Sequence, residues 1–230
     1  MKYFAAAALT AILTAGAASA ATTSAQTVNW SSAANPVTGS QSGSYTASSD
    51  EVFLGSNGSR AFVSDVTTSG DFTYTGTMRA TNDNDTMGVV FGYADAANNF
   101  RISWSGSNID EYDGLALIRE TGGTSTRIYE EANNHWAVNK DYDFSITVAA
   151  GNISFSITEG SNTIASATVA AGGSTDGKLG VFIYSNYTNF TNLAYDLTPG
   201  TTAVPLPAGA PLLIAGIGAF AALRRRKKAA

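Results

Sequence analysis

Alternation of apolar and polar residues is the dominant pattern in the middle of the chain. It is clearest in 71–79 (DFTYTGTMR), 100–104 (FRISW), 115–119 (LALIR) and 142–148 (YDFSITV). A period of two residues places every second side chain on the same face of an extended strand, so each segment is predicted to be a half-buried β-strand. No window of about 12 residues in this part of the chain carries the apolar stripe of an amphipathic helix.

Turn residues divide the alternating segments at short intervals. Residues 149–152 and 160–162 separate strand 142–148 from 153–158 and 164–169, which predicts a three-stranded meander. Two further strands are expected at 178–184 and 190–197, and Val28 and Trp30 are the apolar residues of a possible first strand. Short strands separated by Gly, Asn and Ser indicate one antiparallel β-sandwich domain over residues 21–197.

The two ends of the chain have a different pattern. Residues 1–20 contain one lysine, an apolar stretch and small residues up to Ala20, which is typical of a secretory signal peptide cleaved between Ala20 and Ala21. At the other end, a linker at 198–203 precedes an uncharged segment at 208–223, where a single transmembrane helix is expected. Its 16 residues are fewer than the ~20 that cross a bilayer, so it is a marginal anchor.

The C-terminal segment 204–230 resembles a known sorting signal. A proline motif is followed by the apolar helix and a basic cluster at the extreme C-terminus, in the order of the VPLPA-type PEP-CTERM signals. The motif residues are Val204, Pro205, Leu206, Pro207 and Ala208, and the membrane-orienting basic cluster is Arg224, Arg225, Arg226, Lys227 and Lys228. The alternative is an ordinary tail anchor with prolines before it.

The resemblance to PEP-CTERM proteins implies a partner and a location. The partner is an exosortase-type processing enzyme of Gram-negative bacteria that make exopolysaccharide. The protein would be exported, anchored in the inner membrane through its C-terminal helix before processing, and then placed at the cell surface or in the extracellular matrix. The basic cluster after the helix agrees with an exported N-terminal body, because such clusters stay in the cytoplasm.

Two blocks in the body resemble a lectin-like module. Residues 83–93 (DNDTMGVVFGY) with 100–104, and 177–182 (GKLGVF) with 193–195, are similar to the C-terminal module of thrombospondins. The wider group is the concanavalin-like jelly roll, shared with laminin G domains and legume lectins. The resemblance implies an all-β antiparallel jelly-roll sandwich, and Gly88 and Gly92 are expected where another backbone crosses a central strand closely.

Charge and cysteine content restrict the possible partners. All 18 acidic residues lie between Asp50 and Asp196 with only seven basic residues, so this body has a formal net charge of −11. Nucleic acid is not expected as a partner, because its phosphates would be repelled. The absence of cysteine excludes disulfides and Cys-based metal or redox sites. Calcium and polysaccharide are the partners that this composition allows.

Asp83 and Asp85 are the predicted metal ligands. Alternating carboxylates on one loop can supply two of the six to eight oxygens that calcium takes, so calcium is the candidate cofactor. The loop departs from an EF-hand, since the twelfth position is Ala94 and not Glu. The alternative is a turn in which Asx side chains bond the local backbone.

No catalytic residues are predicted. The single histidine, His135, has no recognisable partner in the sequence, and the acids at 110–113 and 130–131 do not form the E-x-D-x-x-E pattern of jelly-roll glucanases. Tyr112, Tyr184 and Tyr187 are candidate glycan-stacking residues. The predicted function is therefore a non-catalytic, lectin-like surface or matrix protein that binds glycan, with a carbohydrate-active enzyme (a glycoside hydrolase or lyase) on the same fold as the alternative.

Overall fold

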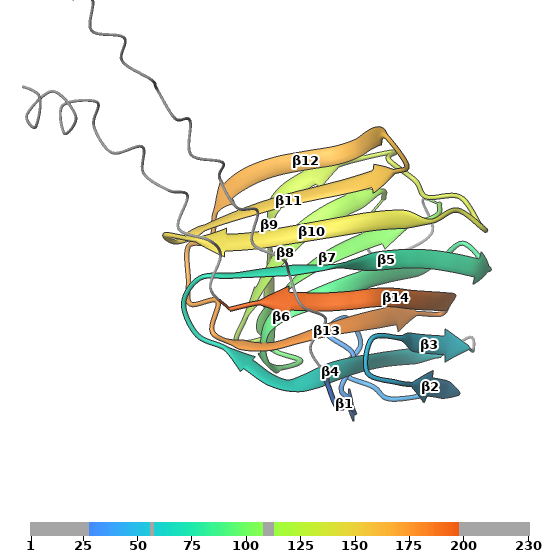
Figure 1. Cartoon of the computed structure of the whole chain (residues 1–230), viewed down its shortest axis with the longest axis horizontal. Coiled ribbons are helices and arrows are strands. Elements are labelled where there is room, and N and C mark those ends of the chain that lie inside the picture. Colours follow the sequence, from blue (N-terminus) through green and yellow to red (C-terminus); the bar gives the residue numbers. More distant parts are fainter. Residues whose placement is uncertain (1–27, 56–57, 108–112, 198–230) are drawn as a thin grey trace, which may run out of the picture. The chain divides into compact units, whose positions relative to one another are not determined.

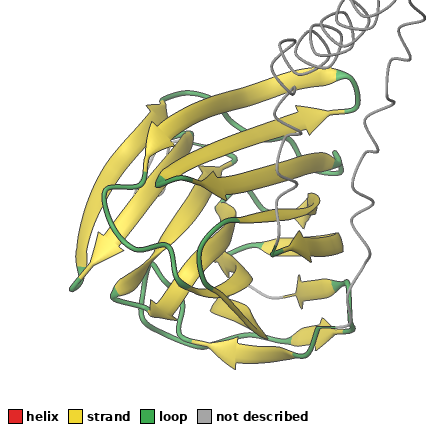
Figure 2. Cartoon of the chain, turned by 60° about the vertical axis from the view of Figure 1, so that its left-hand side comes forward, coloured by secondary structure: helices red, strands yellow, loops and turns green. Residues whose placement is uncertain are grey.

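The computed structural model describes residues 28–55, 58–107 and 113–197, which belong to one compact unit, Thr23–Pro199. These residues form β-strands, turns and loops, without a helix among them (Figure 2). Within the described ranges, no helix is long and apolar enough to span a membrane. The predicted signal peptide, linker, sorting motif, apolar helix and basic cluster lie outside the described residues.

The strands form two stacked seven-stranded antiparallel sheets (Figure 1). Sheet A contains, in spatial order, β1 (Trp30–Ala33), β4 (Ser59–Thr68), β13 (Gly177–Tyr184), β6 (Thr86–Asp95), β7 (Asn98–Ser105), β8 (Leu115–Thr121) and β9 (Thr124–Glu131). Sheet B contains β12 (Asn162–Ala170), β11 (Asn152–Glu159), β10 (Tyr142–Ala149), β5 (Phe72–Asn82), β14 (Tyr187–Asp196), β3 (Val52–Gly55) and β2 (Tyr45–Ala47). The expected antiparallel sandwich is confirmed.

The alternating segments form the strands expected of them. Residues 71–79 lie almost wholly in β5, and 100–104, 115–119 and 142–148 lie in β7, β8 and β10. The meander of β10, β11 and β12 is confirmed by consecutive antiparallel pairing. Phe91 and Phe155, at apolar positions, are buried between the sheets. Trp104 and Tyr142 meet there edge to face with ring centroids 4.7 Å apart, which couples the two sheets.

Sheet A is buried on its outer face as well. A second apolar cluster, which includes Val63, Val90 and Phe182, lies on this face and is covered by residues 34–41, here called the strap. Asn35 holds the strap in place: its Nδ2 donates to the Ile183 carbonyl at 2.5 Å, and its Oδ1 accepts from the backbone N–H of Val37 at 2.7 Å. The strap therefore forms a fixed wall on a sheet face that would otherwise be open to solvent.

Tyrosines with a raised pKa should make the fold sensitive to alkali. Burial raises the pKa of Tyr74, and burial together with the hydrogen bond to Glu131 raises the pKa of Tyr129 to about 12. A raised folded-state pKa contributes stability that is fully present below the unfolded-state value of ~10 and is lost as pH rises above it. We expect the free energy of unfolding, measured by denaturant titration, to fall steadily from about pH 10 upward.

The Tyr74→Phe variant is the control for this effect. Its fall in unfolding free energy above pH 10 should be shallower than that of the wild type, since the most deeply buried phenol is gone. A wild-type unfolding free energy that stays constant while its tyrosines ionise would contradict the assignment.

Candidate glycan-binding clefts

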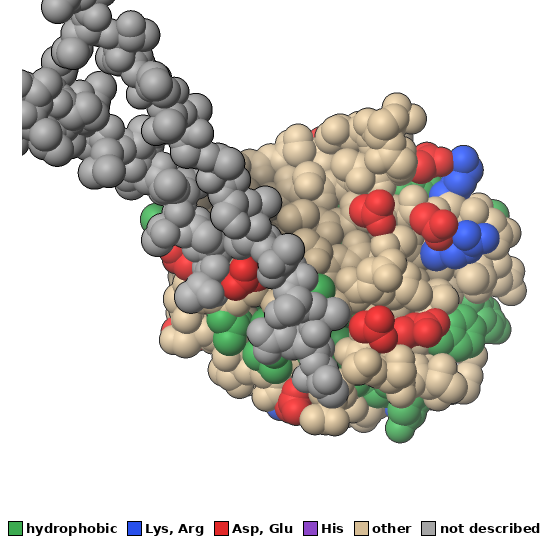
Figure 3. Space-filling view, viewed as in Figure 1, with side chains coloured by type: hydrophobic (Ala, Val, Ile, Leu, Met, Phe, Trp, Pro, Cys, Tyr) green, Lys and Arg blue, Asp and Glu red, His purple; other side chains and the backbone are tan. Residues whose placement is uncertain are grey.

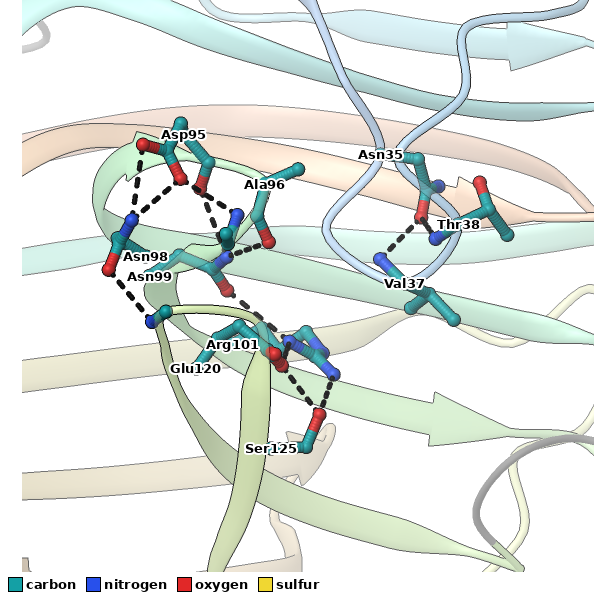
Figure 4. Close-up of polar contacts among 12 residues, drawn as sticks. Asn35, Val37, Thr38, Asp95, Ala96, Asn98, Asn99, Arg101, Glu120 and Ser125 are labelled. Atoms are coloured by element: carbon teal, nitrogen blue, oxygen red, sulfur yellow. Dashed lines mark hydrogen bonds and ion pairs between the residues drawn. The ribbon is translucent and has the colours of Figure 1, made fainter.

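Two hairpin turns at one end of sheet A are joined into a rigid rim. The β8–β9 turn donates from Gly123 N–H to the Ala97 carbonyl and from Gly122 N–H to Asn98 Oδ1, both at 3.0 Å. In the β6–β7 turn, Asp95 Oδ1 accepts from the Ala97 N–H at 2.8 Å and from Asn98 Nδ2 at 2.9 Å (Figure 4). These bonds hold the rim without help from a ligand.

Below this rim lies a buried ion pair. Arg101 on β7 and Glu120 on β8 point to the outer face of sheet A, and Nη1 lies 2.9 Å from Oε2 (Figure 4). Their side chains are only 1% and 6% exposed. Ser125 Oγ donates to the same carboxylate oxygen at 2.5 Å and lies 3.4 Å from Arg101 Nη2, which places one hydroxyl across the pair.

This ion pair is not explained by stability. Taking two charges out of water costs free energy that their attraction often fails to recover, so well-packed apolar residues would serve the fold equally well. One donor is also left over, because the buried Nε–H of Arg101 has no hydrogen-bond partner within the described residues. A costly, incompletely satisfied polar group at the surface of a sheet is a candidate for ligand recognition.

The ion pair forms the floor of a cleft of about 340 Å³, called the outer cleft. Its walls come from the strap on one side, the β6–β7 turn at the end and the β8–β9 hairpin on the other side. The lining residues are Pro36, Val37, Gly39, Ala96, Ala97, Arg101, Glu120, Gly123 and Ser125. The cleft thus combines a charged, hydrogen-bonding floor with small and apolar walls, the composition of small-ligand sites.

A second cleft of about 460 Å³ adjoins the same rim and is called the end cleft. Arg119 lines it, and its Nη1 donates to the carbonyls of Gly172 at 2.7 Å and Ala171 at 3.3 Å. Asn98, Thr124 and Asp176 add further amide, hydroxyl and carboxylate groups. Glu120 contributes to the lining of both clefts.

The chemistry of both clefts suits a polyhydroxylated ligand. Arginine and asparagine donate hydrogen bonds to sugar hydroxyls, and carboxylates accept hydrogen bonds from them. A planar guanidinium or carboxylate group can make two such bonds at once. Acidic and basic groups occur together in each cleft, so neither favours a strongly charged ligand. The arrangement is typical of orientation by hydrogen bonds. The Ser125 hydroxyl does lie beside a carboxylate, but that carboxylate, Glu120, is already paired with Arg101.

The described acids that were considered for catalysis each interact with a different neighbouring side chain. His135 Nε2 lies 3.2 Å from Asp113 Oδ1, so the histidine does have a carboxylate neighbour. Glu130 pairs with Arg127 at 2.6 Å, and Glu131 accepts from Asn134 Nδ2 at 2.6 Å. None of these residues lines either cleft. Asp110 and Glu111 lie outside the described residues.

The predicted metal ligands lie in the turn between β5 and β6. Asp83 has φ 72° and its Oδ1 accepts from the Asn84 N–H at 2.9 Å, while Asn82 Oδ1 accepts from the Asp83 N–H at 2.9 Å. The described ranges contain no group of three or more His, Asp or Glu side chains suited to a metal ion. Two carboxylates alone fall short of calcium's usual oxygen count, so the turn geometry favours the Asx alternative and calcium stays a prediction.

The predicted glycan-stacking tyrosines do not meet in one site. Tyr184 ends β13 and Tyr187 begins β14, and both are half-buried. Neither lines the outer cleft or the end cleft, and Tyr112 lies outside the described residues. Their role in binding stays a prediction. Arg101 and Glu120, which the sequence did not single out, occupy polar positions of alternating strands and gave no signal of burial.

No family model matches the chain, and no curated protein is similar to it in sequence. Solved structures do share its fold. The carbohydrate-binding module CBM66 from Bacillus subtilis superposes with a TM-score of 0.57 at 16% identity, over 74% of this chain and 96% of that one. The exoplasmic domain of VIP36, bound to Ca²⁺ and Man3GlcNAc, gives 0.55 at 10% identity, over 76% and 86%.

A third similar structure is the legume lectin-like domain from Entamoeba histolytica, with a TM-score of 0.51 and 12% identity over 73% of this chain and 90% of that domain. At these identities the likeness establishes the fold alone. The chain has the lectin-like β-sandwich that its sequence blocks implied.

Proposed function

We propose that the protein is a non-catalytic glycan-binding module whose primary site is the outer cleft. The observation that carries the proposal is the buried Arg101–Glu120 pair, with its unpartnered Nε–H, at the floor of a cleft on the outer face of sheet A. The similar structures include a carbohydrate-binding module and a domain solved with mannose glycans, which supports the same class of ligand. Of the acids of the alternative enzyme hypothesis, Asp113, Glu130 and Glu131 line neither cleft, so hydrolysis is the less favoured reading.

Binding should be lost when the outer cleft is filled. The probes are an array of neutral bacterial polysaccharides and mannose oligosaccharides, followed by calorimetry on any that bind. Ala96→Trp places a large ring in the outer cleft without removing a core side chain, and we expect affinity to fall at least about tenfold. Ala132→Trp, in the exposed turn at the other end of β9, is the matched control and should bind like wild type.

Each result of this experiment decides a separate point. If no glycan binds the wild-type protein, the glycan-binding proposal is wrong. Should Ala96→Trp bind as tightly as wild type, the outer cleft is not the site. Gly173→Trp, which occupies the end cleft, distinguishes a ligand that extends into that cleft from one confined to the outer cleft.

Export and sorting form the second part of the proposal. The signal peptide ending at Ala20 and the Val204–Ala208 motif support an exported protein processed by an exosortase-type enzyme and placed at the cell surface or in the matrix. We expect mass spectrometry of the surface-exposed protein to give Ala21 as its first residue and a C-terminus upstream of Ala230. An intact C-terminus in surface-exposed protein would contradict sorting cleavage.

Calcium is proposed only as a ligand of the β5–β6 turn, at Asp83 and Asp85. The Ca²⁺-bound VIP36 domain among the similar structures supports testing it. Calorimetric titration of the protein with calcium alone should show binding that Asp85→Asn abolishes. If the wild-type protein gives only heats of dilution, it does not bind calcium. Repeating the glycan measurement with chelator would show whether glycan binding needs calcium.

A further inference from the structure

The four edge strands of the two sheets differ sharply in how they are protected. In sheet A, β1 has only four residues, and β9 carries Arg127, Glu130 and Glu131. In sheet B, β2 has only three residues. Short length and charge are the usual means by which proteins prevent exposed edges from pairing with other chains. These three edges are therefore blunted.

β12 is the exception. It has nine residues, contains no charge and no proline, and pairs with β11 on one side, with no strand on its other side in the described part of the chain. No charged residue occurs between Glu159 and Asp176. The space-filling view shows a mostly uncharged surface over β11 and β12, with charged side chains gathered toward the right-hand strand ends (Figure 3).

The backbone groups available along this edge can be identified. Ala171 N–H donates to the Gly151 carbonyl of the β11 side, so by alternation Ala165, Ala167 and Val169 also face β11. Ser166 and Thr168 then direct their N–H and C=O groups away from the sheet. Ile164, next to a register shift, directs its carbonyl outward as well, where it accepts one long bond of 3.4 Å from Asn134 Nδ2.

We propose that β12 pairs antiparallel with β12 of a second copy of this chain, joining the two B sheets into one continuous sheet. A twofold axis through Ser166 sets Ser166 opposite the partner's Ser166 and Ile164 opposite the partner's Thr168. Every residue pair in this register is uncharged, and the outward N–H and C=O groups of both strands meet as hydrogen-bonded pairs. The strand is thus self-complementary. The charged edge strand β9 differs from it in carrying Arg127, Glu130 and Glu131.

The size of the contact sets the expected affinity. Nine residues extend for about 30 Å, and one sheet layer with its side chains is about 10 Å wide, which gives a strip of about 300 Å² per partner. Stable interfaces bury about 800 Å² per partner, so this dimer should be weak and dependent on concentration. A protein displayed densely at a surface would reach such concentrations locally.

The full chain should therefore show reversible dimerisation in sedimentation velocity as its concentration rises from about 1 to 300 µM, the range of weak transient interfaces. Ser166→Pro removes an N–H on the free side of the edge strand while leaving the bonds to β11 in place, so we expect the dimer Kd to rise at least about tenfold. A wild-type chain that stays monomeric throughout this range overturns the proposal, and so does a dimer that Ser166→Pro does not weaken.

Disulfide trapping tests the register and does not depend on the proline variant folding. The chain has no cysteine, so a single introduced thiol can cross-link only two copies. Cα atoms in a hydrogen-bonded antiparallel pair lie ~5.5 Å apart, within disulfide range, so Ser166→Cys should form a linked dimer on mild oxidation. Thr168→Cys lies about 14 Å from its equivalent in this register and should cross-link at least tenfold more slowly.

Ser145→Cys, on the outward face of the interior strand β10, is the control for random collision. It should cross-link as slowly as Thr168→Cys. Equal rates for all three variants would overturn the strand pairing.

Discussion

Glu120→Ala is expected to lower the free energy of unfolding by about 3 to 5 kcal/mol, measured by denaturant titration at neutral pH. The substitution leaves the Arg101 guanidinium 1% exposed, without its carboxylate partner and with an Nε–H that already lacks one. Ser125 offers one hydroxyl, which does not neutralise a buried cation. The loss of unfolding free energy therefore measures the cost of leaving a buried charge without a partner. It exceeds the net contribution of the ion pair to stability.

A second ion pair of the same chemistry supplies the control. Arg127 and Glu130 lie 2.6 Å apart on β9, but their side chains are 45% and 36% exposed. Solvent screens such a pair, so Glu130→Ala should cost at most about 1 kcal/mol. Similar losses in Glu120→Ala and Glu130→Ala would show that burial does not set the cost at Arg101.

The double variant Arg101→Met/Glu120→Leu separates the fold from the site. Replacing both charges with apolar side chains of similar volume removes the desolvation cost, so most of the stability lost in Glu120→Ala should return. Glycan binding should stay weak, because Ser125 would then be the one hydrogen-bonding side chain among the residues that line the outer cleft. A stable double variant that still binds glycan would place recognition elsewhere.

The strand pattern predicted the fold because each sheet has a face on a common core. In β5 and β10 apolar residues alternate with Thr, Ser and Asp, and the alternation matches the observed burial almost residue by residue. β9 was not predicted because it is an exposed edge strand whose sequence, TSTRIYEE, has little apolar content. β4 was not predicted because both of its faces are partly buried, so its apolar and polar residues do not alternate.

The candidate site could not be predicted for a related reason. A polar residue in an alternating strand is expected to face water, and Arg101 in FRISW fits that expectation. It is buried because the strap and the β8–β9 hairpin, distant in sequence, cover the outer face of sheet A at that point. Asn35, which fixes the strap, follows the first strand expected at Val28 and Trp30, in a segment for which the alternation predicted no element.

Gly88, by contrast, was correctly expected to mark a close approach in the MGVVFGY strand. A Cβ added there would overlap the Ile102 carbonyl oxygen on the neighbouring strand and lie 2.5 and 2.7 Å from ring carbons of Phe182. We expect Gly88→Ala to lower the free energy of unfolding by about 3 kcal/mol or more, since a paired backbone cannot move aside. Thermal unfolding followed by circular dichroism would measure the loss.

Two variants identify the cause of that loss. Gly151→Ala, at a turn with φ 76° and no atom within 4 Å of the added Cβ, should cost only about 1 kcal/mol from its left-handed backbone. Adding Phe182→Leu to Gly88→Ala removes the ring contact but leaves the carbonyl in place, so stability should not recover. Recovery of stability would mean that the Phe182 ring, and not the β7 backbone, requires glycine at position 88. If stability does not recover, the close pairing of β6 and β7 requires it. In that case Gly88 serves the fold and not the binding clefts.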